Sequence, residues 1–443
     1  MIKHHLMISA VAAMMLSAAC NTREQKKEEN KDKADTIFTA SQTLDLPAPY
    51  ATKSAAVYCD VIGWPQGKTP TVPAGFSVTA YAKDFINPRN VYQAPNGDVF
   101  VVESNTEAKG TTKAEILING KGKSQRLGTS ANRITLLRDT NKDGVPDQRS
   151  TYLAGLNQPY GVLIIGTDFY VANTDGLWRY PYNTDDSIMR SSGKKIVDLP
   201  AGGYNNHWTR NIVANKDNNK IFISVGSGSN VAEHGMTNEI RRADVLQVNP
   251  DGSGETVYAS GLRNPAGLAI QPNTGELYSA VNERDELGDN LVPDYVTSVK
   301  QGGFYGWPYS YYGAHEDPRM KDNQRPDMVA KALVPDVPLE PHVAALGLHF
   351  YNSNLFPAHY KEGAFIGEHG SWNRSELSGY KVVFVPFQNG KPGKPENFMT
   401  GFIADEKDRK VYGRPVNITT LQDGSLLVAD DSGNIIWRVS YKG

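Results

Sequence analysis

The segment GRPVNITTLQDGSLLVADD, from Gly413 to Asp431, contains two short aliphatic runs on either side of a turn that carries Asp-Gly. Two such runs around a tight turn are typical of antiparallel strands joined as a hairpin. The same arrangement recurs in five earlier parts of the chain, namely NPRNVYQAPNGDVFVVES (87–104), NQPYGVLIIGTDFYVAN (157–173), HWTRNIVANKDNNKIFISVGSGSN (207–230), RNPAGLAIQPNTGELYSAVN (263–282) and, with a longer insertion, ALGLHFY to FIGEHGSWN (345–373). One strand pair is therefore repeated along most of the chain.

These repeats predict an all-β fold, and their number predicts a six-bladed β-propeller. Pro88 and Pro415 open the first and last repeats, and their spacing gives about 65 residues per unit. A minimal four-stranded blade needs about 40–45 residues, so loop insertions would account for the excess. No stretch shows sustained helical periodicity, and a β-sandwich with extra loops is the alternative. We expect one propeller domain over residues 50–443.

The composition excludes several classes of protein. Lys and Arg number 46 and Asp and Glu number 48, so the net charge is −2, without the basic excess of a typical nucleic-acid-binding protein. The only cysteines are Cys20 and Cys59. Two cysteines exclude a disulfide framework, a cysteine-rich zinc site, an iron–sulfur cluster and a CxxCH haem attachment within this chain.

The N-terminal residues have the pattern of an export signal. A short polar or positive stretch precedes the apolar run from Leu6 to Leu16, which is too short to span a bilayer comfortably. Residues 1–20 resemble a bacterial lipoprotein signal in which Cys20 is lipidated, and an ordinary secretory signal cut nearby is the alternative. Residues 21–49 begin with a highly charged stretch and predict a flexible tether. We expect a cell-envelope protein, lipid-anchored to a membrane and facing the periplasm or the exterior.

Polar residues at equivalent positions of the repeats would meet around the mouth of a propeller channel. Arg89, Arg263 and Arg414 occupy similar contexts, and Arg374 adds a fourth cation. A mouth lined by these guanidinium groups would suit a multiply anionic ligand, because the guanidinium fork binds carboxylates bidentately. The alternative is that each arginine pairs with a local Asp or caps a turn.

Two histidines are candidates for a general base. His207 opens the third repeat beside Gly and Asn residues, and a neutral imidazole can accept the proton of a hydroxyl group near physiological pH. His369, in GEHGSWNR, is the second candidate. A structural role is the alternative for either residue.

The segment DTNKDGVPD resembles the start of a calcium-binding loop. Its side-chain oxygens come from Asp139, Asn141, Asp143 and Asp147, with a glycine at the sharp turn. The twelfth position is Ser150, where such loops carry a bidentate Glu. The segment is therefore either a weak peripheral calcium site or a β-hairpin turn.

Five motifs together resemble the glucose/sorbosone dehydrogenase family and the related pyranose dehydrogenases that use pyrroloquinoline quinone (PQQ). They are SGLRNPAGLA, GGFYGWPY, HVAALGLHFY, FIGEHGSWNRSELSGYKVVFVPF and GRPVNITTLQDGSLLVADDSGNIIWRV. The resemblance runs from about Val72 to Tyr441 and implies a six-bladed propeller. It also implies PQQ and calcium at the mouth, with a sugar as the substrate.

The resemblance assigns roles to residues of this chain. It implies that the cofactor is contacted by Arg89, Arg263, Asn264, Asn373, Arg374 and Arg414, and that backbone carbonyls of Glu283 and Arg284 bind calcium. His207 matches the family's base, which would take the proton of the anomeric hydroxyl during oxidation to a lactone, or to an acid from a sorbosone-type aldehyde. Because the chain has no haem attachment motif, electrons would pass to a separate acceptor, a cytochrome or a quinone.

The sequence departs from the family at the turn after the third repeat. Soluble glucose dehydrogenases carry there an acid that orients the base, whereas this chain has Ser227 at the nearest position. Either another acid, such as Glu233 or Asp244, takes that role, or His207 is held differently. Two other functions remain as alternatives, a calcium-dependent lactonase-like propeller and a non-catalytic surface binding propeller.

Overall fold

The structure is a computed structural model of the 443-residue chain. It describes residues 44–107, 120–125 and 127–443, and the part from Asp45 to Gly443 forms one compact unit. The predicted signal over residues 1–20, with Cys20, and most of the predicted tether lie outside the described residues. Within the described ranges, no helix is long and apolar enough to cross a membrane.

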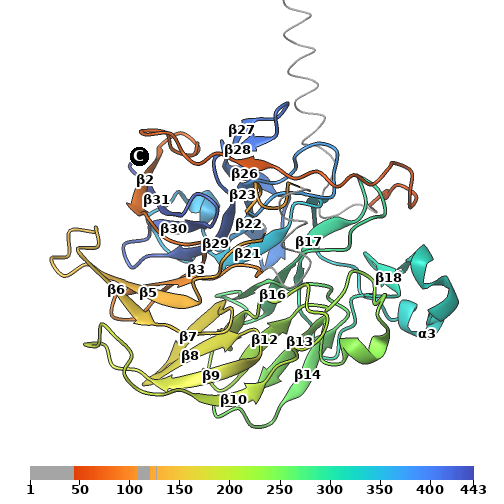
Figure 1. The fold of residues 1–443 in the computed structure, drawn as a ribbon, viewed down its shortest axis with the longest axis horizontal. Coiled ribbons are helices and arrows are strands. Elements are labelled where there is room, and N and C mark those ends of the chain that lie inside the picture. Colours follow the sequence, from red (N-terminus) through yellow and green to blue (C-terminus); the bar gives the residue numbers. More distant parts are fainter. Residues whose placement is uncertain (1–43, 108–119, 126) are drawn as a thin grey trace, which may run out of the picture. The chain divides into compact units, whose positions relative to one another are not determined.

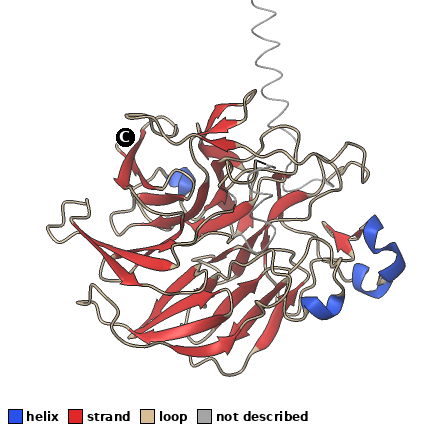
Figure 2. Cartoon of the chain, viewed as in Figure 1, coloured by secondary structure: helices blue, strands red, loops and turns tan. Residues whose placement is uncertain are grey.

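Six four-stranded antiparallel sheets account for most of the regular structure, and the all-β prediction is confirmed (Figures 1 and 2). The first three sheets consist of β3 (Pro88–Gln93), β4 (Val99–Glu103), β5 (Arg133–Arg138) and β6 (Gln148–Leu153); β7 (Gly161–Ile165), β8 (Asp168–Asn173), β9 (Gly176–Pro181) and β10 (Lys194–Asp198); and β11 (Ile212–Ala214), β12 (Ile221–Val225), β13 (Asp244–Val248) and β14 (Thr256–Ser260). The other three consist of β15 (Gly267–Ile270), β16 (Leu277–Val281), β17 (Pro293–Ser298) and β20 (Val337–Pro341); β21 (Ala345–Phe350), β22 (Ala364–Glu368), β23 (Lys381–Val385) and β26 (Glu396–Met399); and β29 (Pro415–Thr420), β30 (Leu426–Asp430), β31 (Ile435–Tyr441) and β2 (Phe76–Ala82).

Smaller elements lie outside these sheets. A three-stranded sheet contains β1 (Asp60–Val61), β27 (Ile403–Asp405) and β28 (Lys410–Val411). Two short hairpins contain β18 (Ser310–Tyr311) with β19 (His315–Glu316), and β24 (Phe387–Gln388) with β25 (Lys391–Pro392). The helical segments described are η1 (Met236–Glu239), η2 (Pro318–Asn323), α3 (Pro326–Val329) and η3 (Ala358–Tyr360).

Each sequence repeat forms the first two strands of one sheet. In the last repeat, β29 pairs with β30 in the antiparallel sense, with Thr420 opposite Leu426 across the Asp-Gly turn. Gly424 in that turn has a φ of +88°, a backbone conformation that favours glycine. The second strands β4, β12, β16, β22 and β30 are buried along their whole length, which explains their continuous aliphatic runs.

The sheets follow one another in a closed cycle. The first strands contact their neighbours in the order β3, β7, β11, β15, β21, β29 and back to β3. The cycle closes because β2, near the start of the described chain, adds to β31 with Phe76 opposite Tyr441 (Figure 1). Six sheets in a cycle are not the two stacked sheets of the sandwich alternative.

The segment from Asp139 to Asp147 is the turn that joins β5 to β6. Asp139 accepts hydrogen bonds from the backbone N–H groups of Asp143 and Gly144, at 3.2 and 2.7 Å. Asp147 accepts hydrogen bonds from the hydroxyl and N–H of Thr140. The carboxylates therefore stabilise a hairpin turn, while calcium binding there stays a prediction.

Candidate functional site

The predicted site residues gather at one end of the cycle. Antiparallel pairing sets the start of each first strand opposite the end of the second strand, as with Pro88 and Glu103, and with Pro415 and Asp430. We call this end the mouth. The predicted residues found there, at strand ends or in the loops that follow, are Arg89, His207, Arg263, Asn264, Glu283, Arg284, Asn373, Arg374 and Arg414.

Arg89 and Arg414 belong to one buried cluster with His369 and Asp431. The Nε atom of Arg89 lies 3.0 Å from Asp431 Oδ2, as an ion pair without hydrogen-bond geometry, and the guanidinium lies over the Trp208 ring. Both carboxylate oxygens of Asp431 lie 2.9 Å from His369 Nε2. Arg414 donates to the backbone carbonyls of His369, at 2.9 Å, and of two further residues. Sheets at the two ends of the chain are joined by this cluster.

Burial and charge determine the protonation states in this cluster. Burial and the nearby Arg414 charge lower the pKa of His369 to about 3, so this imidazole is neutral at pH 7. Burial alone would raise the pKa of Asp431, but His369 and the Arg89 guanidinium outweigh burial and lower it. Asp431 is therefore an ionised carboxylate that compensates buried arginine charge.

A second cluster surrounds Arg263, which is 3% exposed. Its guanidinium forms an ion pair of 2.9 Å with Asp285 and donates hydrogen bonds to Asn230 Oδ1, at 2.9 Å, and to the Glu283 carbonyl, at 2.6 Å. The His342 imidazole lies 3.6 Å from the other carboxylate oxygen of Asp285. Asp285 therefore lies between two cationic or titratable groups.

His207 is held by Ser227 and lies against an asparagine. The Nδ1 atom of His207 lies 2.8 Å from the Ser227 carbonyl and 3.0 Å from its hydroxyl oxygen. Since a carbonyl only accepts, Nδ1 carries the proton and Nε2 is the acceptor in the neutral tautomer. A Cβ on Gly226 would lie 2.5 Å from Asn264 Oδ1 and 2.6 Å from His207 Cβ, so only glycine fits between them.

The two acids named as examples, Glu233 and Asp244, lie in different surroundings. The carboxylate of Glu233 accepts the backbone N–H groups of Asn230 and Val231 in its own loop. Burial raises the pKa of Asp244 to about 8, so this group is largely protonated at pH 7. The contacts seen at His207 Nδ1 are those of Ser227.

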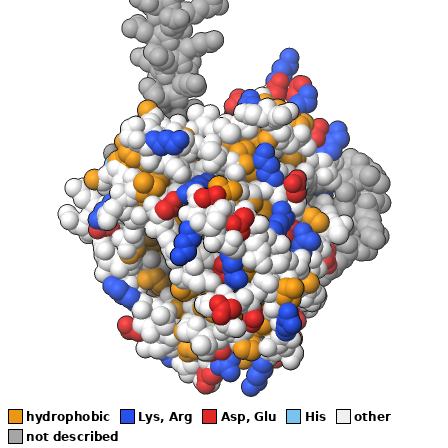
Figure 3. Space-filling view, turned by 90° about the vertical axis from the view of Figure 1, so that its left-hand side faces the viewer, with side chains coloured by type: hydrophobic (Ala, Val, Ile, Leu, Met, Phe, Trp, Pro, Cys, Tyr) orange, Lys and Arg blue, Asp and Glu red, His pale blue; other side chains and the backbone are white. Residues whose placement is uncertain are grey.

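The predicted positive mouth is largely neutralised by the protein itself. Arg89 and Arg263 pair with carboxylates, and Arg374 lies 4.0 Å from Glu340 and bonds to Ser378. Arg284 is fully buried between Glu283 and Asp317, at 2.9 and 3.1 Å. Local pairing, the alternative reading of these arginines, is therefore observed. On the face shown in Figure 3, acidic and basic side chains are interspersed.

Several residues that complete the site were not identified from the sequence. They are Asp431, Asp285, Asn230 and His342. Asp431 and Asn230 each end a repeat, so the equivalence of repeat positions was the signal that could have found them. Asn373 was predicted, and its amide connects the Glu286 N–H, at 2.7 Å, to the carbonyl of Ala55.

A family model described as "Domain of unknown function (DUF7133)" matches residues 67–437. This match covers most of the chain. The chain belongs to the DUF7133 family. It is 30% identical over 390 residues to an uncharacterized protein of Borreliella burgdorferi, covering 84% of this chain and 91% of that protein.

More distant relatives of this DUF7133 chain have named activities. It is 24% identical over 367 residues to a PQQ-dependent pyranose dehydrogenase of Coprinopsis cinerea, covering 73% of this chain and 46% of that enzyme. The chain thus spans about half the length of that relative. The structure of the PQQ domain of a pyranose dehydrogenase from Coprinopsis cinerea matches with a TM-score of 0.66 at 19% identity, covering 86% of this chain and 100% of that domain. The DUF7133 chain therefore has the same fold as PQQ-dependent sugar dehydrogenases and is distantly homologous to them.

Glu368 lies directly before His369 at the mouth of this DUF7133 chain. Its burial predicts that replacing it changes the pH dependence of stability. Burial raises its pKa to about 8, and its Oε2 atom has no hydrogen-bond partner among the described residues. When folding raises the pKa of a carboxyl group, the free energy of unfolding falls as the pH rises from the unfolded pKa to the folded pKa of that group. We expect Glu368→Gln to raise the free energy of unfolding by on the order of 2–4 kcal/mol at pH 8, and by little below about pH 4.5.

Urea unfolding at a series of pH values measures this difference. Glu340→Gln is the matched control, because Lys381 and Ser378 bond to Glu340 and its pKa is lowered despite burial. The control should therefore destabilise the protein at neutral pH, which is the opposite sign. A Glu368→Gln effect that does not change with pH would contradict the raised pKa.

Proposed function

We propose that this chain is a six-bladed propeller enzyme that oxidises a sugar with PQQ as its cofactor. The observation that carries the proposal is the juxtaposition of His207 with Asn264 at the mouth, where Gly226 brings the two side chains together. The closed cycle of six sheets supports the propeller, and distant homology to sugar dehydrogenases supports the reaction class. The oxidised product would be a lactone, or an acid from an aldehyde substrate.

The polar groups left over at the mouth fit an anionic, hydrogen-bonding cofactor. The Nε atom of Arg89 is buried and has no aligned hydrogen-bond partner among the described residues, although it lies 3.0 Å from Asp431. The Oδ1 atom of Asn264 is also buried without a hydrogen-bond partner in the described structure. Buried polar groups without partners are costly, so both atoms indicate a bound group that completes them. A carboxylate of PQQ would suit Arg89, and a donor group would suit Asn264 Oδ1.

Within the proposed reaction, each residue has a separate task. PQQ, when bound, supplies an ortho-quinone that takes up hydride from the sugar carbon. His207 accepts the hydroxyl proton at Nε2, because the Ser227 carbonyl holds the proton on Nδ1. Arg89, Arg263, Asn264, Asn373, Arg374 and Arg414 would hold the cofactor or support the residues that hold it.

Calcium binding at the mouth would require the Arg263 guanidinium to move away from the Glu283 carbonyl. The Glu283 carbonyl, one of the two proposed ligands, accepts a hydrogen bond of 2.6 Å from the Arg263 guanidinium. A guanidinium bonded to this oxygen disfavours calcium coordination by the same oxygen, because the two cations repel each other. Arg263 would pair with a carboxylate of PQQ, and the Glu283 carbonyl would then be available to calcium. We therefore expect calcium to bind at the mouth with PQQ present, and at least tenfold more weakly without it.

Isothermal titration calorimetry with calcium chloride, with and without saturating PQQ, measures this coupling. Asp143→Asn in the β5–β6 turn is the control, because the variant removes the possible peripheral site near Asp139 and leaves the mouth intact. Equal calcium affinity with and without PQQ in this variant would contradict the coupling.

The cellular setting is part of the same proposal. The lipoprotein-like signal supports export and lipid anchoring at Cys20, with the propeller facing the periplasm or the exterior. The near-zero net charge supports a small neutral substrate better than a nucleic acid. Electrons would leave to a separate cytochrome or quinone.

Reconstitution of the purified chain with PQQ and calcium tests the proposed function. We expect reduction of an artificial electron-accepting dye in the presence of hexoses, pentoses or sorbosone. Absorbance of the bound quinone should report cofactor binding independently of activity. If the chain binds PQQ and reduces no dye with any of these sugars, the redox proposal is wrong and a non-catalytic binding propeller is favoured.

A further inference from the structure

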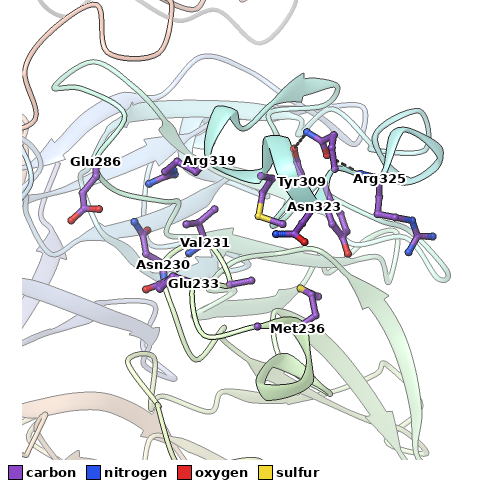
Figure 4. A pocket seen from close by; sticks show the side chains of 13 residues that line it. Asn230, Val231, Glu233, Met236, Glu286, Tyr309, Arg319, Asn323 and Arg325 are labelled. Atoms are coloured by element: carbon purple, nitrogen blue, oxygen red, sulfur yellow. Dashed lines mark hydrogen bonds between the residues drawn. The ribbon is translucent and has the colours of Figure 1, made fainter.

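The lining of an open cavity of about 930 Å³ includes Asn230, a hydrogen-bond partner of Arg263 (Figure 4). Two segments outside the regular sheets contribute most of its lining. One is the loop between β12 and β13, which contains η1, and the other is the insertion between β17 and β20, which contains η2. We call this cavity the side cleft. Its size is near the upper end of the range of about 300–1,000 Å³ that is usual for small-molecule sites.

The side cleft shares residues with the mouth. Asn230 lines the cleft and also accepts a hydrogen bond of 2.9 Å from Arg263. Glu286 lines it and donates its backbone N–H to Asn373 Oδ1, at 2.7 Å. Arg319 lines it and donates to the Asp285 carbonyl, at 2.8 Å. The cleft therefore adjoins the mouth, and the two share residues of their walls.

Three of the four charged side chains that line the side cleft, those of Glu233, Arg319 and Arg325, are already bonded within the protein. Arg319 donates to both carboxylate oxygens of Asp317, and Arg325 donates to both oxygens of Asp327. The Glu233 carboxylate accepts two backbone N–H groups of its own loop. Guanidinium groups engaged in bidentate pairs are poor sites for a further anion. The cleft therefore favours a ligand that carries no net charge.

The remaining groups suit a neutral, hydroxyl-rich ligand. The amide of Asn323 has no hydrogen-bond partner in the described part of the chain and can both donate and accept. The exposed Glu286 side chain adds carboxylate acceptors. Met236, Met320 and Val231 add apolar surface, against which C–H faces of a sugar ring can pack. This mixture of amide, carboxylate and apolar groups matches the amphipathic surface of a saccharide.

We propose that the side cleft binds the non-reacting rings of an oligosaccharide whose reducing end enters the mouth. The proposal rests on the sugar-oxidising function above and specifies its substrate class as chains of two or more neutral sugar units. Oligosaccharide contacts in the cleft would add affinity that a monosaccharide, which occupies only the mouth, does not receive.

Calorimetric titration of the full chain with maltotriose, cellotriose and xylotriose tests the proposal, with glucose and xylose for comparison. We expect at least one trisaccharide to bind wild type at least tenfold more tightly than either monosaccharide. Asn323→Ala should weaken that trisaccharide about five- to tenfold, which corresponds to loss of one or two neutral hydrogen bonds. Met236→Ala should also weaken it, through lost apolar contact.

Asn352→Ala is the matched control, because Asn352 is also an exposed asparagine but follows β21 at the end of the sheet away from the mouth. The control should leave trisaccharide affinity unchanged. The inference is overturned if none of the trisaccharides binds more tightly than the monosaccharides, or if Asn323→Ala and Asn352→Ala behave alike. Because calorimetry requires no turnover, trisaccharide binding without dye reduction would identify failure of the proposed reaction separately from failure of the cleft.

Discussion

Replacement of His207 by alanine is expected to lower sugar-dependent dye reduction by about 10²–10⁴-fold, the usual contribution of a general base. The Ser227 carbonyl fixes the proton on Nδ1 and leaves Nε2 as the acceptor for a substrate hydroxyl. His207 lies at the mouth, half-buried, so its loss should remove proton transfer without unfolding the sheets. Steady-state kinetics of the PQQ-reconstituted chain, together with quinone absorbance as a measure of cofactor binding, checks this expectation.

His359→Ala is the matched control for His207→Ala. His359 is an exposed histidine that pairs with Glu396 at 2.8 Å, and it belongs to η3 outside the mouth. Its replacement should leave kcat unchanged. Ser227→Ala tests the orientation of the base, because it removes the hydroxyl but keeps the backbone carbonyl, and should reduce kcat by about tenfold or less. A His207→Ala enzyme that retains wild-type kcat would assign proton transfer to another residue, and His369 would be examined first.

The hairpins could be predicted from the sequence because their signals are local. Aliphatic runs such as VFVVE in β4 and LLVAD in β30 are buried on both faces, and the turns between strands carry Gly, Asn or Asp. The same repeat logic predicted that Arg89, Arg263 and Arg414 would lie at one end of the cycle, and all three lie at or just before the start of a first strand, while their roles stay predictions. Local pattern therefore identified the strand pairs and the end of the fold that carries the candidate site.

Partners from distant repeats could not be predicted in the same way. The sheet containing β29 is completed by β2, and no local pattern identifies a partner from the opposite end of a chain. The pairing of Arg89 with Asp431 likewise joins the first and last sheets. The repeat pattern gave positions for cations but no information on which carboxylates face them, so the mouth was expected to be more positive than it is. Outer strands also carry a weaker sequence signal: β6, QRSTYL, is partly exposed and lacks a continuous apolar run.

Replacement of Asp431 by alanine is expected to lower the free energy of unfolding by about 3–5 kcal/mol at pH 7, because it leaves buried arginine charge without compensation. The Asp431 side chain is 3% exposed and contacts Arg89 and His369. Its lowered pKa means that its stabilising effect is present above the unfolded pKa of about 3.9 and is lost as the pH falls below that value. Urea unfolding at pH 7 and at pH 3 measures both effects.

Asp423→Ala is the control that separates burial from charge pairing. Asp423 lies in the turn between β29 and β30 of the last sheet and also pairs with an arginine, Arg438, but its side chain is 48% exposed. Solvent screening should limit the cost of Asp423→Ala to about 1 kcal/mol or less. Asp431→Asn keeps the side-chain shape, so its cost relative to Asp431→Ala distinguishes lost charge from lost packing. If Asp431→Ala and Asp423→Ala destabilise the protein equally, the buried cluster does not depend on the Asp431 charge, and Arg89 must already be compensated by other groups at the mouth.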